Sequence, residues 1–264
     1  MTWVEIEPPF QPLFSRSGWN SFDEVVAHFA GGSAREHKVL VRPVTISNPA
    51  GADRNVIGER RLDVYFKQYR FAPPSWRFWR RASKARREFD NYGALAALGI
   101  PVAQRVAVGE KRDALGRLHS AFIITRAVPD SRTLVEFAAR RPKEAVRRQL
   151  TNELAELTRR LHEAGFFYHD LVWRNILVSG QDDPRLVLID CPRGAFARFG
   201  QRRNQLRDLA SLDKSAAAHC RRSERWRFLV RYAGEGAAHE QARRLARACQ
   251  DYRRRRWPED WRGK

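Results

Sequence analysis

Alternating apolar and polar residues predict strands in the first half of the chain. Residues 62–69 alternate most clearly. One face of that strand would be apolar, and the other would carry Tyr65, Lys67 and Tyr69. Apolar, β-branched runs predict further strands at residues 38–46, 102–108 and 121–125, with polar turns at residues 48–51 and 110–119.

Apolar residues three and four positions apart predict amphipathic helices. Ser21, with Glu24 three positions on, is typical of a capping box at a helix N-terminus. In a second helix, Phe89, Tyr92 and Ala96 would mark the buried face. The helices are predicted at residues 21–29, 83–98 and 142–164, the last with leucines at 150, 154, 157 and 161, and they end before Gly31, Gly99 and Gly165.

The composition indicates a folded chain. Hydrophobic residues make up 43% of the 264 residues and aromatic residues 11%, so enough apolar surface exists to offset the entropy lost on ordering. The length suits one large domain or two lobes that share a cleft. Because the pattern changes from strands to helices near residue 128, we expect an N-terminal lobe at 1–128 and a C-terminal lobe at 129–264.

The charge balance points to an anionic partner. Lys and Arg number 50 and Asp and Glu number 30, which gives 50 − 30 = +20 and a pI near 11.0. Nucleic acid, an acidic membrane surface and a phosphorylated or carboxylated glycolipid would each be attracted to such a surface. Charge alone does not choose among them.

Cysteine spacing and hydropathy favour a cytoplasmic protein. Cys191, Cys220 and Cys249 lie far apart without a C-x-x-C pair, so neither a disulfide framework nor a zinc site is indicated. No run of about 18 apolar residues is present, and the N-terminus lacks the basic-then-apolar pattern of a signal peptide. We expect at most a peripheral association with a membrane.

One stretch carries the residue types of a phosphotransfer site. Asp170 and Asn175 lie five residues apart and are followed by apolar runs at 176–178 and 186–189, the second of which ends at Asp190. Phosphoryl transfer needs a carboxylate for the proton of the attacking hydroxyl and oxygen ligands for magnesium. The three side chains supply these groups.

This stretch resembles the catalytic loop and metal-binding Asp of the protein-kinase-like superfamily, His-x-Asp-x-x-x-x-Asn and then Asp-Phe-Gly. The chain has Tyr168 two residues before Asp170, and Asp190 is followed by Cys and Pro. These departures are more typical of the bacterial lipopolysaccharide core kinases and the related small-molecule phosphotransferases, and the further matches favour the former. The resemblance implies an α+β, two-lobed fold with an N-terminal antiparallel sheet plus helix and a mainly helical C-terminal lobe. It also implies ATP and Mg²⁺ as cofactors, Asp170 as catalytic base, and Asn175 and Asp190 as metal ligands.

The same resemblance assigns nucleotide-binding residues in the first lobe. Lys67 matches the strand lysine that pairs nucleotide phosphates, and Glu88 matches the helix glutamate that pairs this lysine. Alternatively, Lys67 is an edge-strand lysine, and Glu88 forms a surface ion pair with Lys84 or Arg87. Asp90 is the rival carboxylate.

Further assignments by resemblance concern the hinge and the loops. Ile124, Arg126 and Ala127 would contact the nucleotide where the second lobe begins. Only Gly51 and Gly58 stand where a glycine-rich phosphate cover would lie. Asp208 resembles an aspartate that braces the catalytic loop. Tyr65 stands where an alanine usually leaves room for adenine.

Two basic, aromatic segments suit contact with an acidic, partly apolar surface. Residues 70–87 hold seven basic and no acidic residues, and residues 221–264 hold fourteen basic and six acidic ones. Either segment can equally be a solvated face. The arginines at 193, 198, 202, 203 and 207 can grip substrate phosphates or serve solubility.

The resemblance therefore implies an ATP-dependent kinase that phosphorylates a sugar hydroxyl of the lipopolysaccharide core at the inner face of the cytoplasmic membrane. The alternatives are a small-molecule or protein kinase of the same fold, a catalytically inactive kinase-like binding module, and a nucleic-acid binder, which is the weaker idea. The adjacent His169 and Asp170 also occur in metal phosphohydrolases, but the chain supplies no further ligands for that chemistry.

Overall fold

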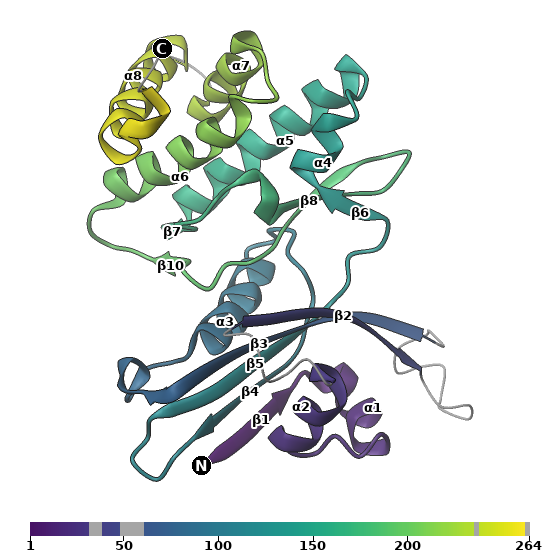
Figure 1. Ribbon diagram of the computed structural model, residues 1–264. Coiled ribbons are helices and arrows are strands. Elements are labelled where there is room, and N and C mark those ends of the chain that lie inside the picture. The colour runs from purple at the N-terminus through teal and green to yellow at the C-terminus, as the bar shows by residue number, and fades with distance from the viewer. Residues whose placement is uncertain (32–38, 48–60, 235–237, 262–264) are drawn as a thin grey trace. The chain divides into compact units, whose positions relative to one another are not determined.

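The computed structural model of the chain describes residues 1–31, 39–47, 61–234 and 238–261. It forms two compact units (Figure 1). Unit 1 comprises residues 1–95 and 103–127, and unit 2 comprises residues 96–102 and 128–264. The short segment of unit 2 at 96–102 is held there by Arg160, whose guanidinium donates to the carbonyls of Leu98 and Gly99, and by the Leu188 N–H, which donates to the Pro101 carbonyl.

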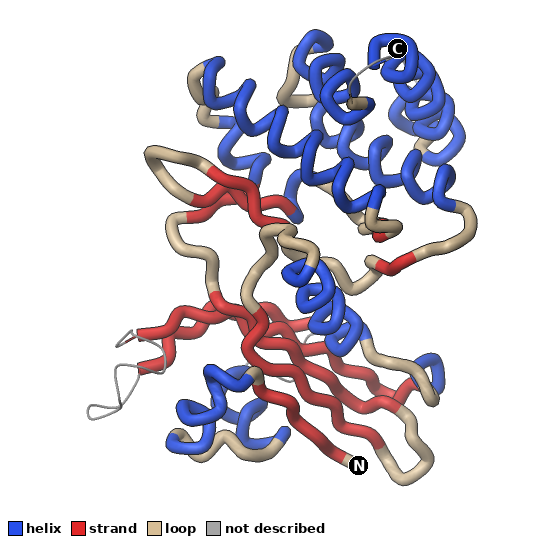
Figure 2. Tube along the Cα trace, turned by 180° about the vertical axis from the view of Figure 1, so that it is seen from behind, coloured by secondary structure: helices blue, strands red, loops and turns tan. Residues whose placement is uncertain are grey.

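Unit 1 is built on a five-stranded antiparallel sheet in the order β1-β4-β5-β3-β2. The strands are β1 (Thr2–Ile6), β2 (Val39–Ser47), β3 (Arg61–Ser75), β4 (Arg105–Arg112) and β5 (Leu118–Arg126). The helical elements are η1 (Pro8–Phe10), α1 (Gln11–Arg16), α2 (Phe22–Ala30), η3 (Trp76–Phe78) and α3 (Lys84–Ala97). Figures 1 and 2 show α3 on one face of the sheet and α1 and α2 at the other.

The core of unit 1 lies between the sheet and helices α1 and α2. Strand residues such as Val64 and Phe66 pack there against Phe14, Val25 and Phe29, all of them at most 1% exposed. Ser21 caps α2 as predicted, because its hydroxyl accepts the Glu24 N–H while the Glu24 carboxylate accepts the Ser21 N–H. The apolar face of β3 is therefore covered by α1 and α2, and its opposite face packs against α3.

Unit 2 is mainly helical with short hairpins. Its strands are β6 (Ser131–Thr133), β7 (Phe166–Phe167), β8 (Ile176–Ser179), β9 (Arg185–Leu188) and β10 (Ala195–Phe196). Its helical elements are α4 (Leu134–Ala139), α5 (Glu144–Glu163), η4 (Trp173–Asn175), α6 (Gln201–Ala216), α7 (Arg222–Ala233), α8 (Ala238–Arg256) and η5 (Pro258–Trp261). The leucine stripe of α5 is buried as predicted. A small cluster joins Ala155 of α5 to Leu209, Tyr232 and Cys249 on the three following helices.

Four predictions about the elements need correction. The strand expected at 102–108 begins and ends later, and the turn expected at 110–119 is confined to residues 113–117. Glu110 resembles a turn residue in sequence but is buried in β4, since its carboxylate pairs with Arg112. On α3, Leu95 is buried and Ala96 is exposed, because the buried stripe continues three residues after Tyr92 rather than four. The strand expected at 62–69 continues to Ser75 as β3.

Other predictions fall partly outside the described residues. These are the turn at 48–51, the candidate phosphate-cover glycines Gly51 and Gly58, and Lys38 at the start of the second strand. Among the helices in the described parts of the chain, none is both long and apolar enough to cross a membrane.

Candidate active site

The predicted pair of Lys67 and Glu88 forms in unit 1. The Lys67 ammonium on β3 lies 3.0 Å from the Glu88 carboxylate on α3, and the two side chains are 16% and 4% exposed. The hydroxyls of Tyr69 and Tyr92 also donate to this carboxylate, at 3.3 and 3.2 Å. Burial of Glu88 places its carboxylate against β3 rather than on the exposed face of α3.

The two tyrosines are site residues that the sequence interpretation missed. Tyr69 follows Lys67 by two strand positions and Tyr92 follows Glu88 by one helical turn, so both periodicities place them on the same face as the pair. The sequence alone thus places each tyrosine on the face of its own element that carries Lys67 or Glu88. It does not show that β3 and α3 pack together, which brings both hydroxyls to the Glu88 carboxylate.

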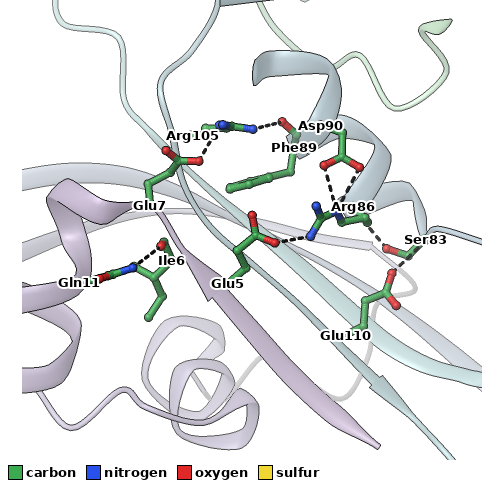
Figure 3. Close-up of polar contacts among 10 residues, drawn as sticks. All are labelled: Glu5, Ile6, Glu7, Gln11, Ser83, Arg86, Phe89, Asp90, Arg105 and Glu110. Carbon is green, nitrogen blue, oxygen red and sulfur yellow. Dashed lines mark hydrogen bonds and ion pairs between the residues drawn. The ribbon is translucent and has the colours of Figure 1, made fainter. Parts of the chain in front are cut away.

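The position of α3 is fixed by polar contacts with neighbouring strands (Figure 3). The Arg86 guanidinium binds the carboxylates of Glu5 on β1 and Asp90 one turn further along α3. Asp90 thus faces away from Lys67, and it is not the partner of the lysine. Arg105 on β4 lies 2.7 Å from the Glu7 carboxylate and donates to the Phe89 carbonyl at 3.4 Å. These contacts hold Glu88 in register with β3.

At the N-terminal end of α3 the contact is with β4. The Glu110 carboxylate accepts the backbone N–H of Ser83 at 3.0 Å, and the Ser83 hydroxyl accepts the N–H of Arg86 (Figure 3). Orphan N–H groups of the first helical turn are thereby satisfied.

The loop around Asp170 in unit 2 has a fixed backbone. The Asn175 side-chain amide donates to the Asp170 carbonyl at 3.0 Å, and the Ile189 N–H donates to the Asn175 carbonyl at 2.9 Å. The Asp170 carboxylate itself is 31% exposed and lies 3.9 Å from the Arg174 guanidinium. The loop is therefore tied to the segment before Asp190, while the carboxylate of Asp170 remains accessible.

A buried carboxylate supports the same loop from α6. Asp208 is 0% exposed, and its two oxygens accept the N–H groups of Tyr168 at 2.7 Å and His169 at 2.8 Å. His162 of α5 approaches this carboxylate at 3.5 Å and bonds the Tyr232 hydroxyl at 2.7 Å. Burial raises the pKa of Tyr232, so its hydroxyl stays protonated. The contacts are those expected of a bracing aspartate.

Tyr168 links the two loops of unit 2. Its ring is fully buried and its hydroxyl donates to the Ile189 carbonyl, one residue before Asp190, at 2.5 Å. Both His169 and Asp190 have a left-handed backbone, with φ of +64° and +61°. Such conformations in non-glycine residues cost free energy and gather at functional sites. His169 directly precedes the predicted base Asp170, and Asp190 is itself a predicted metal ligand.

A model of the lipopolysaccharide kinase (Kdo/WaaP) family matches residues 68–232, more than half of the 264-residue chain. The chain belongs to this family. The matched range starts one residue after Lys67 and includes the predicted residues Glu88, Asp170, Asn175 and Asp190. Membership in the lipopolysaccharide kinase family implies a phosphotransferase that uses ATP.

A solved structure has a fold similar to that of this chain. A structure described as WaaP in complex with acyl carrier protein matches 96% of this chain and 97% of its own, with 23% sequence identity and a TM-score of 0.66. The predicted α+β fold, with an N-terminal antiparallel sheet and a helical C-terminal part, is confirmed. No curated protein sequence matches the chain.

The predicted hinge residues Ile124, Arg126 and Ala127 lie at the end of β5 and just after it. Lys67 pairs with Ile123 across the sheet, and Ile124 pairs with Phe66, so the Ile124 side chain lies in the core under α1 and α2 rather than on the lysine face. That Ile124 contacts a nucleotide stays a prediction. The N–H groups of Arg126 and Ala127 donate to the carbonyls of Gln104 and Asp63. Any adenine contact of these two residues would use other atoms.

Replacing Tyr168 by phenylalanine is expected to lower the free energy of unfolding by about 1–2 kcal/mol, because the Ile189 carbonyl loses its donor inside the protein. Chemical denaturation measures this. Tyr65→Phe is the matched control: Tyr65 is 45% exposed, and the same deletion should change stability by less than about 0.5 kcal/mol. Equal effects in the two variants would contradict a linking role for Tyr168.

Proposed function

We propose that the chain is an ATP-dependent kinase that transfers the γ-phosphate to a sugar hydroxyl of the lipopolysaccharide core. Its family supports the reaction class and the general substrate. The geometry that carries the proposal is the fixed backbone on both sides of Asp170, held by Asp208 before it and by Asn175 after it.

In this proposal Asp170 is the catalytic base. Its accessible carboxylate would accept the proton of the attacking sugar hydroxyl, and the rigid loop would keep it at hydrogen-bonding distance. Phosphoryl transfer gains most from positioning and charge stabilisation, because little covalent chemistry is left to the protein. A loop with its backbone N–H and carbonyl groups already satisfied suits that task.

Lys67 would bind the nucleotide phosphates. The Glu88 carboxylate accepts hydrogen bonds from Lys67, Tyr69 and Tyr92, which fix the carboxylate and with it the lysine ammonium. The lysine side chain is the more accessible member of the pair, at 16% against 4%. The carbonyl groups around Arg126 and Ala127 would contact adenine.

Asn175 and Asp190 fit a magnesium site of the kinase type. The Asn175 amide nitrogen is committed to the Asp170 carbonyl, which turns the amide oxygen away from it, and oxygen is the atom that Mg²⁺ takes. One amide oxygen and one carboxylate suffice when substrate phosphates complete the coordination. When bound, Mg²⁺ would offset the negative charge of the phosphates.

The acceptor in this proposal is an anionic glycolipid presented at a membrane surface. The net charge of +20 supports an acidic partner, and a small neutral acceptor would not call for it. We place the reaction at the cytoplasmic face of the membrane, with the enzyme peripheral to it. Small-molecule or protein phosphorylation on the same fold is the main competing proposal.

Transfer from labelled ATP tests the reaction. The wild-type chain should label dephosphorylated core glycolipid and should leave casein and a free monosaccharide unlabelled. Labelling of the protein or the free sugar, with none of the glycolipid, would replace the lipopolysaccharide proposal by the competing one. Labelling of no acceptor, together with unaltered ATP, would favour an inactive binding module.

A thermal shift with Mg-ATP tests the nucleotide site. At a ligand concentration of about 100 times Kd the native state should gain about 2.7 kcal/mol, and Asp190→Asn should lose most of this gain. Asparagine tolerates the left-handed backbone of residue 190, so the variant isolates the charge. Asp182→Asn, in the exposed turn between β8 and β9, is the control and should keep the full shift. An undiminished shift in Asp190→Asn would argue against Asp190 as a metal ligand.

A further inference from the structure

Two exposed tryptophans lie at one end of the sheet of unit 1. Trp76 and Trp79, in and just after η3, are 56% and 50% exposed, and Leu115 in the β4–β5 turn is 58% exposed. Figures 1 and 2 show that η3 and the β4–β5 turn lie at the same end of the sheet. This end is opposite to the one where β5 runs out at Arg126 and the chain passes to unit 2. Large apolar side chains gathered in this way on a surface indicate a contact with another body.

Arginines surround both indoles. The Arg117 guanidinium lies 5.4 Å from the centre of the Trp76 ring, and that of Arg80 lies 5.6 Å from the centre of the Trp79 ring. Arg77 and Arg81 are exposed beside them. We call this set the Trp76–Trp79 surface; its members are Trp76, Arg77, Trp79, Arg80, Arg81, Leu115 and Arg117.

The backbone beneath the Trp76–Trp79 surface is held in place by one partly buried arginine. Arg112 on β4 donates to the carbonyls of Phe78 at 2.8 Å, Arg81 at 2.9 Å and Gly116 at 3.1 Å, and it pairs with Glu110. A single guanidinium thus joins the segment after β3 to the β4–β5 turn. The indoles are presented on a fixed base, so little conformational entropy would be lost when the surface binds.

The acidic groups near this surface are already engaged. Asp113 pairs with Arg117 at 2.6 Å, and Glu110 is buried against Arg112. Residues 70–87, which supply most of the surface, contain seven basic and no acidic residues. The face as a whole is positive, and it attracts an anionic body.

A shallow groove beside Trp79 could accept a headgroup. It has a volume of about 490 Å³, and its lining includes Trp3, Trp79, Arg80 and Arg81. Indole rings beside arginines suit the boundary between lipid headgroups and acyl chains. Amphipathic rings bind at this depth, and nearby cations contact the acidic headgroups.

The C-terminal segment is less suited to this role than its composition suggests. Where the structure describes the side chains of this segment, the aromatic ones are partly or fully buried. They are Trp226, Phe228, Tyr232, Tyr252 and Trp257. They pack within and between helices, as Tyr232 does beside Phe228 and Trp257 beneath Lys214. The sequence indicated two segments that suit contact with an acidic, partly apolar surface or are solvated, and the structure exposes Trp76 and Trp79 of the first.

We propose that the Trp76–Trp79 surface docks the chain on an anionic lipid bilayer. The indoles and Leu115 enter the headgroup region while the arginines contact acidic lipids. This inference extends the proposed function, since a kinase of a membrane glycolipid must reach its substrate at the bilayer. It does not depend on that function, because vesicle binding needs no catalysis.

Sedimentation with vesicles tests the proposal. The full-length chain should sediment with phosphatidylcholine vesicles that contain phosphatidylglycerol and should stay in solution with pure phosphatidylcholine. Trp76→Ala/Trp79→Ala should weaken the binding at least tenfold, because both indoles lose apolar area that the bilayer would bury. Arg77→Gln/Arg80→Gln/Arg81→Gln should weaken it by a similar factor or more, because each cation near an acidic surface contributes about fivefold.

The matched control uses the other exposed aromatic pair of the described chain that is flanked by arginines. Phe196 and Phe199 are 56% and 90% exposed and lie next to Arg198, Arg202 and Arg203. Phe196→Ala/Phe199→Ala should bind vesicles like the wild type. If this variant loses binding and the tryptophan variant does not, the docking surface has been misassigned and the proposal is wrong.

The remaining outcomes are also decisive. Failure of the wild type to sediment with acidic vesicles overturns the proposal, and so does tryptophan-independent binding that only the arginine variant reduces. If light scattering shows that the tryptophan variant abolishes self-association, the surface joins copies of the chain instead. Thermal midpoints should match the wild type, since more than half of the Trp76 side chain is already exposed. Phosphate transfer, assayed separately on detergent-dispersed acceptor, can fail without affecting these results.

Discussion

Asp170→Asn is expected to slow phosphate transfer by about three orders of magnitude, because an amide cannot accept the proton of the attacking hydroxyl. The substitution preserves the size of the side chain. The backbone carbonyl of residue 170 still accepts from Asn175, so the loop should keep its conformation. Mg-ATP should therefore still raise the thermal midpoint while the chemical step is nearly lost.

Single-turnover transfer from labelled ATP measures the rate of that step. Asp183→Asn is the control, since Asp183 is 65% exposed in the β8–β9 turn, where it pairs with Arg185. It removes the same charge from the same unit and should leave the rate within about twofold, as expected for an exposed pair. A variant at residue 170 that keeps a tenth or more of the wild-type rate would show that another group takes the proton.

The residues of the catalytic loop could be predicted because their relation is local. The five-residue spacing of Asp170 and Asn175 and the strand before Asp190 can be read directly from the chain. The pair of Lys67 and Glu88 is different, since the two lie on separate elements and their contact depends on packing. Resemblance to a family supplied it, and the 3.0 Å contact agrees.

Features that depend on tertiary contacts escaped prediction. In the sequence Tyr168 looked like a departure from a kinase motif, whereas its hydroxyl bonds the Ile189 carbonyl 21 positions away. The sequence could not assign Ile124 to a face, because β5 carries buried apolar residues on both sides. The face was set by pairing with β3, which places Ile123 opposite Lys67.

The composition of a segment predicted the exposure of its side chains less well than the hydrophobic pattern predicted helices and strands. The charges of Glu110 and Arg112 favoured the prediction of a turn. In the structure the two side chains form an ion pair on strand β4, which offsets the cost of burying Glu110. Likewise, the aromatic residues of the C-terminal segment suggested an exposed interface, but helices α6, α7 and α8 bury Tyr232 with Leu209 and Cys249. Which side chains remain for a partner is decided by packing, and a single sequence does not contain that information.

Asp208→Asn is expected to be strongly destabilising. The two carboxylate oxygens of Asp208 accept the N–H groups of Tyr168 and His169, and the side chain is 0% exposed. An amide presents one oxygen and one NH₂ group, so one backbone N–H would face another donor. The expected loss of stability is about 3 kcal/mol, from one unmet buried donor and from the charge-assisted bond to the other.

The same change should slow transfer even at temperatures where the variant is folded. Residues 168 and 169 lead directly into Asp170, and a displacement of about 1 Å at a reacting group can cost about 10²-fold in rate. Urea denaturation gives the stability, and kcat measured well below the thermal midpoint gives the activity. The two readouts separate positioning of the base from general unfolding.

Asp213→Asn is the matched control, because Asp213 lies on the same helix, α6, and binds Arg225 and Arg253 rather than the catalytic loop. This variant should lose stability, since it breaks two partly buried ion pairs, but its kcat should stay near the wild-type value. A loss of kcat as large as that of Asp208→Asn would mean that activity follows the stability of α6 alone. In that case the N–H bonds from Tyr168 and His169 to Asp208 would have no separate part in holding Asp170.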